Sequence, residues 1–158
     1  MNGRVYAVSF SAVAVAAAQD LFEIAPADDK LVEILGFNLG QYSDAGDAQD
    51  EMLSIAIVRG HATTGSGGGA FTPLPLVMSD TAAGFAAEIN NTTIASAGTG
   101  VTLYADSFNV RAGIEKWFPP DCCLPCSQAS GVLIVLRLLA APADSVTMNG
   151  TLYVKEYG

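Results

Sequence analysis

One short stretch holds most of the residues that could do chemistry. Lys116 to Gln128 reads KWFPPDCCLPCSQ, and it contains all three cysteines and the only tryptophan of the 158-residue chain. Cys123 and Cys126 form a C-x-x-C pair, and Cys122 is adjacent. Cysteines at this spacing serve as zinc ligands, as redox pairs or as disulfide partners. The stretch is therefore a candidate metal site, redox site or structural loop.

Neither a metal site nor a redox site is favoured by the rest of the sequence. A structural zinc site needs four thiolate or imidazole ligands, but the only histidine, His61, lies far away in the sequence. A thioredoxin-type pair sits near βαβ units, and none is visible. Two readings of Cys122, Cys123 and Cys126 stay open: a disulfide, within or between chains, or small packing residues in a tight loop. We expect no metal and no cofactor.

Two aromatic residues, Trp117 and Phe118, precede the prolines of this stretch. Each proline fixes φ and removes a backbone donor, so we expect a stiff loop that does not extend a sheet. Exposed on such a loop, Trp117 and Phe118 are candidate anchors for a partner. The reading we favour is that Trp117 closes one end of the core, because most tryptophans are largely buried.

No other segment carries recognisable catalytic machinery, so we expect that the protein is not an enzyme. The acidic segment 41–51 lacks the ligand spacing of an EF-hand and is predicted to be solvated. Residues 65–69 read GSGGG without the Lys-Ser/Thr of a P-loop, which predicts a flexible loop tip. A G-x-S-x-G nucleophile elbow is also missing from the sequence.

The elements that must position these residues are predicted to be strands. Tyr6, Val8 and Phe10 alternate with small residues, which is typical of a strand with one buried face rather than of a signal peptide. The large apolar residues then change parity at Val13 and Val15, which predicts a β-bulge at residues 11–12.

The same pattern of strand and turn continues along the chain. Residues 71–78 contain two prolines and are predicted to be an edge strand or an extended loop, and 81–89 a helical turn or a strand. Residues 132–139 form a continuous apolar run suited to a central strand, and 145–157 alternate cleanly. The remaining predicted strands are 21–24, 31–39, with both faces buried, 52–59 and 101–110.

Eight or nine short strands with long loops predict one all-β domain over residues 1–158, an antiparallel β-sandwich. A jelly roll is the first choice among sandwiches. An immunoglobulin-like sandwich is second, because it would need a core tryptophan between two distant cysteines.

Composition points to burial against other copies of the chain. Hydrophobic residues make up 51% and charged residues 15%, where about 25% charged is usual. A membrane-spanning helix needs about 20 consecutive apolar residues, and the best run is shorter and is broken by Arg137. A net charge of −9 argues against nucleic acid as a partner. We therefore expect a homo-oligomer with large apolar interfaces.

The second half, SFNVRAGIEKWFPP followed by GVLIVLRLLAAPADSVTMNGTLYVKEYG, resembles small virion proteins of tailed bacteriophages. The likeness lies in an all-β chain that is poor in charge, rich in Ala and Gly, and ends in a polar-apolar strand. It is similar to the jelly-roll decoration or cement proteins that sit on capsids, often as trimers. The resemblance implies a structural protein of the capsid surface that binds the major capsid protein and stiffens the shell. It assigns a role to no individual residue.

Two other classes of function stay open. One is a receptor- or glycan-binding head of a fibre, which would need exposed aromatic residues and convergent polar groups in a groove. The other is an extracellular filament subunit, whose amino-terminal strand would be donated to a neighbour.

Overall fold

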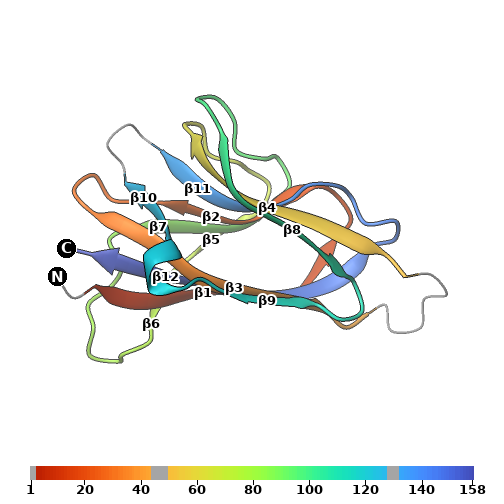
Figure 1. The fold of residues 1–158 in the computed structure, drawn as a ribbon, viewed down its shortest axis with the longest axis horizontal. Coiled ribbons are helices and arrows are strands. Elements are labelled where there is room, and N and C mark those ends of the chain that lie inside the picture. Colours follow the sequence, from red (N-terminus) through yellow and green to blue (C-terminus); the bar gives the residue numbers. More distant parts are fainter. Residues whose placement is uncertain (1–2, 44–49, 128–131) are drawn as a thin grey trace.

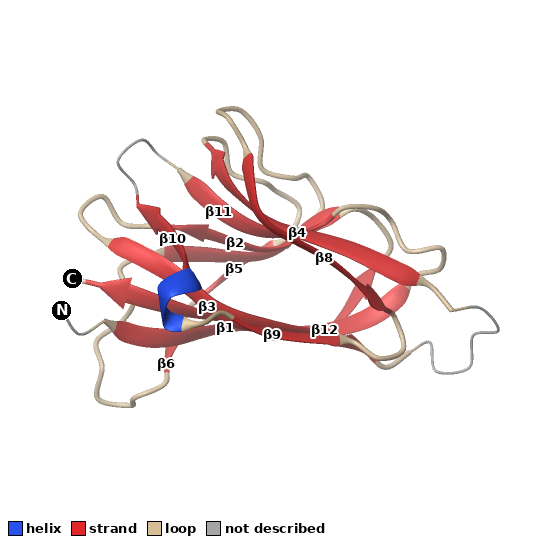
Figure 2. Ribbon diagram, in the orientation of Figure 1, coloured by secondary structure: helices blue, strands red, loops and turns tan. Residues whose placement is uncertain are grey.

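Two antiparallel sheets packed face to face make up the protein (Figure 1). The structure, a computed structural model, describes residues 3–43, 50–127 and 132–158. Within these ranges the only helix is the short 3-10 helix η1 (Pro120–Cys122), and no helix is long and apolar enough to cross a membrane (Figure 2). The prediction of an all-β antiparallel sandwich is confirmed.

The first sheet, called sheet A, contains both ends of the described chain. Its order is β10-β3-β12-β1-β6, with β9 also paired to β3. The strands of sheet A are β1 (Arg4–Val15), β3 (Leu31–Gln41), β6 (Leu74–Pro75), β9 (Ile114–Trp117), β10 (Leu124–Ser127) and β12 (Val146–Tyr157).

The second sheet, called sheet B, has the order β5-β7-β2-β11-β4-β8. The apolar run near residue 135 forms β11, which lies between β2 and β4, so the predicted central strand is confirmed. The strands of sheet B are β2 (Gln19–Ala25), β4 (Met52–His61), β5 (Gly69–Phe71), β7 (Ala86–Asn91), β8 (Val101–Asn109) and β11 (Leu133–Leu138).

The strands form nested antiparallel pairs, in which early strands of the chain pair with late ones. The outermost pair is β1 with β12, followed by β2 with β11 and then β3 with β9 and β10. The innermost pair is β4 with β8. Successive pairs lie in alternate sheets. The segment between β4 and β8 adds β6 at one edge of sheet A, and it adds β7 and then the edge strand β5 beside β2 in sheet B.

Strand β1 carries the irregularity that its sequence predicts. Its register against β12 shifts between Phe10 and Val13, and Ala12 has a positive φ of 58°. The shift keeps Phe10 and Val15 on the core side of one continuous strand. The predicted β-bulge at residues 11–12 is confirmed.

Strand β3 differs from the expectation of one regular strand buried on both faces. Its register against β12 shifts at Leu35, because Ile34 pairs with Val154 while Gly36 pairs with Tyr153. Ile34 and Phe37 therefore both face the core, whereas Leu35 is only half-buried. The expected burial of both faces is not met, because an extra residue in the strand changes the parity and its outward side chains are only half-buried.

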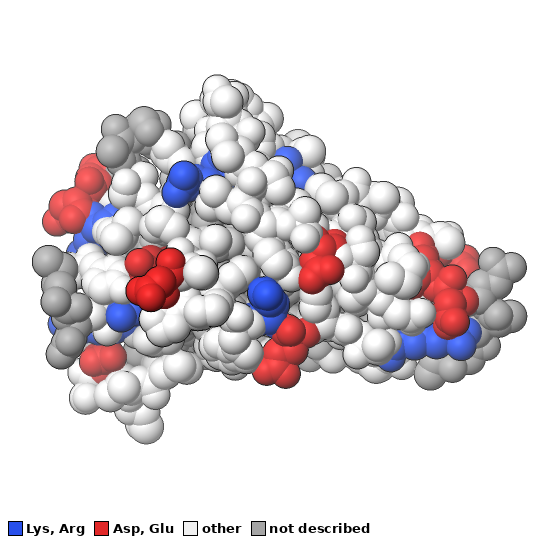
Figure 3. All heavy atoms as spheres, in the orientation of Figure 1, with Lys and Arg blue, Asp and Glu red and all other residues white. Residues whose placement is uncertain are grey.

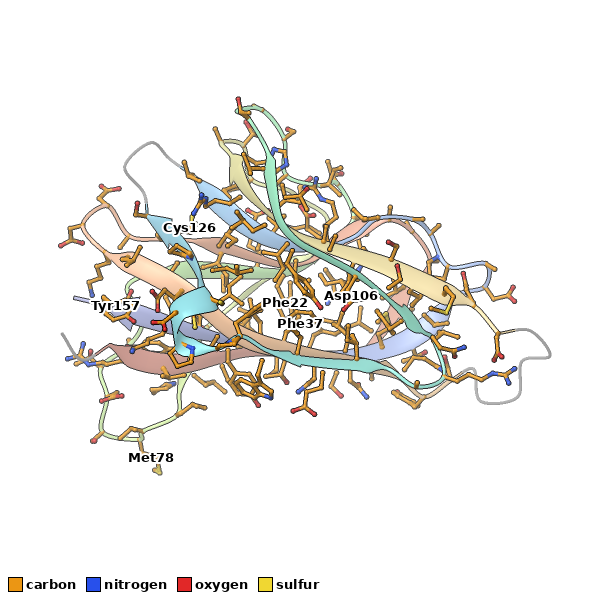
Figure 4. All side chains as sticks on the ribbon, viewed as in Figure 1. Phe22, Phe37, Met78, Asp106, Cys126 and Tyr157 are labelled. Atoms are coloured by element: carbon orange, nitrogen blue, oxygen red, sulfur yellow. The ribbon has the colours of Figure 1, made fainter. Side chains whose placement is uncertain are left out.

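The core fills the space between the sheets with large side chains, including the fully buried Tyr6. Phe22 and Phe37, also fully buried, lie between the two sheets (Figure 4). A second, smaller cluster lies on the outer face of sheet B. It consists of Ala56, Val58, Ala95, Leu133 and Val135. Strands β4 and β11 are thus buried on both faces, which explains the continuous apolar runs of their sequences.

Segments 62–68 and 92–99 cover that outer face of sheet B. They are joined by the isolated bridges Thr63–Ser96 and Ser66–Thr93. The backbone N–H of Ala95, in the second segment, donates to the carboxylate of Asp20 at 2.7 Å. The outer face of sheet A, in contrast, presents half-buried and exposed side chains of β3, β9 and β12.

Candidate functional site

The cysteine-rich stretch is an edge strand that is interrupted in its middle. Strand β9 pairs with residues 36–39 of β3, and β10 pairs with residues 31–34 of the same strand. Between them, residues 118–123 lie outside the strands and include the 3-10 helix η1 (Pro120–Cys122). The expectation that this stretch cannot extend a sheet is wrong: Pro125 lies within β10, at an edge where a missing donor is tolerated.

The three cysteines have different surroundings, and all three are free thiols. Cys126 points into the core with 1% of its surface exposed, whereas Cys123 is half-buried and Cys122 is exposed. Extended backbone turns residues three apart to opposite faces, so the C-x-x-C pair is split between the core and the surface. The packing reading therefore describes Cys126.

Burial also makes the Cys126 thiol a weak acid. It raises the pKa of Cys126 to about 11, and it raises the pKa of Cys123 as well, with the Glu33 carboxylate adding to the effect there. Both groups are therefore neutral thiols near pH 7, and thiolate is the form that attacks or ligates. Within the described ranges, no group of three or more His, Cys, Asp or Glu side chains could hold a metal ion.

Trp117 does not close the end of the core, contrary to the reading favoured from its sequence. Its side chain is 52% exposed and lies on the outer face of sheet A. The indole stacks on Tyr153 with ring centroids 4.9 Å apart, and Nε1 donates to the Glu115 carboxylate at 2.7 Å. Gly36 makes room for the ring, since a Cβ there would lie 2.7 Å from Trp117 Cε3. The exposed indole is therefore held in one orientation.

Phe118, unlike Trp117, is partly buried and faces the core. Its ring packs against the core cluster and meets Tyr104 edge-on, with centroids 5.3 Å apart. Lys116 lies above both rings, 5.4 Å from the Tyr104 centroid and 5.7 Å from the Phe118 centroid. Of the two candidate anchors, only Trp117 is more than half exposed.

A groove of about 490 Å³ begins beside Trp117 on the outer face of sheet A. Its walls come from β1, β3, β12 and the η1 turn, and this set is called the aromatic groove. The groove is lined by Gly3, Val5, Glu33, Leu35, Trp117, Phe118, Pro120, Cys123, Lys155 and Tyr157.

The two charged side chains of the aromatic groove, Glu33 and Lys155, both contact Tyr157. The Tyr157 hydroxyl donates to Glu33 Oε2 at 2.7 Å, and Lys155 Nζ lies 4.7 Å from the centroid of the Tyr157 ring. Tyr157 hydrogen bonding raises the pKa of Lys155. The groove thus contains one carboxylate and one ammonium, together with aromatic surface.

Reasoning from sequence missed Glu33, Tyr153, Lys155 and Tyr157 as members of this site. The last three alternate along the final strand with the buried Val154, so their outward direction was readable. Their proximity to Trp117 was not readable, because it depends on the pairing of β12 and β9 with β3.

A second exposed feature is an apolar loop at the edge of sheet A. Four large side chains in residues 74–78 are more than half exposed: Leu74 at 56%, Leu76 at 55%, Val77 at 57% and Met78 at 98%. Leu76 is tied to β1 by its N–H, which donates to the Val5 carbonyl at 2.9 Å. Met78 lies at the tip of the loop, away from the body (Figure 4). The sequence predicted an edge segment here, but not an exposed one.

The glycine-rich segment is not an open loop tip. The N–H of Gly65 donates to the buried Glu23 carboxylate at 2.9 Å, and a Cβ on Gly68 would lie 2.1 Å from the carbonyl oxygen of Ile89. Glycine is required because two backbones touch. Residues 44–49 of the acidic segment lie outside the described residues.

The charged groups beneath segments 62–68 and 92–99 hold these segments against sheet B. Arg137 holds the fully buried Asp20 by two hydrogen bonds of 2.6 and 3.1 Å, and it also donates to the Ala95 carbonyl at 3.0 Å. His61 Nε2 lies 3.4 Å from Arg137 Nη1. These groups are engaged with one another and with the backbone, so they position the two segments.

Comparison with protein-family models, with curated proteins and with solved structures finds no match for this chain.

Proposed function

We propose that this protein is a structural subunit of a virion, a decoration protein of the capsid surface that works as a homo-oligomer without catalysing a reaction. The apolar loop of residues 74–78 carries this proposal. Four large apolar side chains that lie together and are more than half exposed are typical of an interface. Its partners would be other copies of the chain and the major capsid protein.

The nested pairing of the strands supports the jelly roll as the fold of this subunit. Jelly rolls are built from eight strands in two sheets and occur in viral capsid proteins. Here four nested pairs carry the two sheets: β1 with β12, β2 with β11, β3 with the interrupted edge strand of β9 and β10, and β4 with β8. The fold by itself does not define a function, so the assembly argument rests on the surface.

The surface supports burial against neighbours rather than contact with DNA. Charged side chains are scattered over a largely uncharged face (Figure 3), and the net charge is −9. A stable interface buries about 800 Å² per partner, which is a modest share of the 7518 Å² that the described chain exposes. The apolar loop would supply the centre of such an interface.

The first experiment measures the mass of the purified protein by light scattering, with and without reductant. We expect a closed oligomer of a few copies that is insensitive to reductant. The double variant Leu76→Ser, Met78→Ser should shift it to monomer. Met52→Ser is the matched control, since Met52 is 62% exposed but lies outside the loop, and it should leave the mass unchanged.

A second measurement tests the capsid surface itself. The protein should co-sediment with empty shells of the major capsid protein of the same virus, and the double loop variant should not. A monomeric wild type without affinity for shells would refute the proposal. Long fibres that dissolve on reduction would instead favour a filament subunit cross-linked through the exposed Cys122.

A further inference from the structure

Beyond assembly, we propose that the aromatic groove binds a neutral carbohydrate, with a pyranose ring lying against Trp117. The indole is more than half exposed although it is fixed on three sides. Tyr153 lies under it, Glu115 holds Nε1, and Gly36 leaves space for its edge. A ring that is already ordered loses little conformational entropy when a ligand covers it.

The shape of the site suits a flat ligand with one apolar face. A pyranose presents axial C–H groups on a face and hydroxyls around its rim. The indole, Leu35 and Val5 supply apolar surface in the aromatic groove, and its volume of about 490 Å³ lies within the range of about 300–1,000 Å³ usual for ligand sites. A few sugar units would fit along it.

The charges in the groove select a neutral ligand rather than an ion. Glu33 and Lys155 are of opposite sign, and Cys123 keeps its proton because its pKa is raised. A carboxylate can accept about four hydrogen bonds and an ammonium can donate three, so the one bond from Tyr157 to Glu33 leaves capacity for a ligand. Hydroxyl groups, which both donate and accept, match this mixed rim.

The single tryptophan of the chain makes the test direct, since its fluorescence reports on this groove alone. The purified full chain is first applied to a printed glycan array that includes bacterial surface polysaccharides. It is then titrated with cellohexaose, maltohexaose and chitohexaose, with a heparin-derived hexasaccharide as the anionic control. We expect a saturable change in fluorescence with a neutral glycan, and protection of Trp117 from quenching by acrylamide.

Variants separate stacking from folding. Trp117→Ala should weaken binding in calorimetry by at least about tenfold, equal to about 1.4 kcal/mol, whereas Trp117→Phe should retain part of the affinity. Tyr42→Ala is the matched control, because Tyr42 is 58% exposed but does not line the groove. Its affinity should equal that of the wild type.

Three results would overturn the proposal. One is an array on which no neutral glycan retains the protein, and another is full affinity in Trp117→Ala. The third is a fluorescence change that follows protein concentration without any glycan, which would show a second copy of the chain in the groove. The mass of the oligomer and its loop variant are measured separately, so assembly and glycan binding can fail independently.

Discussion

The outer faces of the two sheets differ although both sheets have six strands. Segments 62–68 and 92–99 cover sheet B, with a small apolar cluster and the Asp20–Arg137 pair beneath them. The outer face of sheet A has an exposed tryptophan and an open groove. The chain's own loops thus cover the outer face of sheet B, whereas the outer face of sheet A keeps aromatic side chains exposed.

Polar groups show the same contrast between the two faces. Under the covering segments, Asp20, Glu23 and Asn91 are at most 2% exposed. Asp20 accepts a hydrogen bond from the N–H of Ala95, and Glu23 accepts from the N–H of Gly65 and from the Asn91 side chain. In the aromatic groove, Glu33 and Lys155 are partly open. Buried polar groups must be satisfied within the protein, whereas open ones can still serve a ligand.

The largest expected loss of stability comes from a substitution under the covered outer face of sheet B. Arg137→Met leaves the fully buried Asp20 carboxylate without its cation, and removing one partner of such a pair costs about 3–5 kcal/mol. The free energy of unfolding, measured in urea, should fall by this amount. On the open face, Lys155→Met should change it by less than about 0.5 kcal/mol. Equal losses in both variants would contradict the distinction between the faces.

The next prediction compares the same substitution, Val→Ala, on the outer faces of the two sheets. Val135→Ala empties space in the small cluster of sheet B, where Val135 is fully buried, and should cost about 2 kcal/mol. Val5→Ala removes the same two methyl groups from the half-buried floor of the aromatic groove and should cost less than about 1 kcal/mol. Thermal unfolding of the two variants checks the order, and a reversed order would refute it.

A pH effect sharpens the comparison through Glu23. Burial, followed by repulsion from Glu88 and Asp20, raises the pKa of Glu23 above its usual 4.5, against the lowering by its hydrogen bonds. A raised carboxyl pKa favours the folded state at low pH, and this advantage is lost as the pH rises through the folded pKa. Glu23→Gln should therefore gain stability relative to the wild type between about pH 4 and 7.

The control for this experiment has the opposite sign. The Tyr104 hydroxyl donates to Asp106 at 2.5 Å and lowers the pKa of that exposed carboxyl. Asp106 therefore stabilises the folded state above its unfolded pKa, and the contribution is lost as the pH falls. The Asp106→Asn variant should lose stability relative to the wild type as the pH rises from about 3 to 6. Parallel pH profiles of the two variants would contradict both assignments.

The last comparison sets the exposed Trp117 against the buried core. Trp117→Ala removes a ring that is half exposed and that stacks only on Tyr153, so the free energy of unfolding should fall by only about 1 kcal/mol. Truncating the fully buried Phe37 should cost about 3–5 kcal/mol. A loss in Trp117→Ala as large as that in Phe37→Ala would show that the tryptophan serves the fold rather than a partner.

The strands were predictable where burial differs between successive residues. In β12 the buried Val146, Met148, Leu152 and Val154 alternate with polar residues, so both the strand and its inward face follow from a local period of two. The bulge of β1 was equally readable, since Phe10 and Val13 change parity within a few residues. The continuous run of β11 predicted a central strand but not which side each residue faces.

The sequence by itself determined the all-β sandwich class and the scarcity of charge, because these depend on composition and on neighbours along the chain. Only the tertiary structure decided that Cys126 packs inside while Trp117 lies outside, and that Glu33, Lys155 and Tyr157 share a groove. Those outcomes depend on the register of β3 against β9, β10 and β12. Such pairings join residues that are far apart in the sequence, from Leu39 with Ile114 to Leu31 with Tyr157, and no local pattern encodes them.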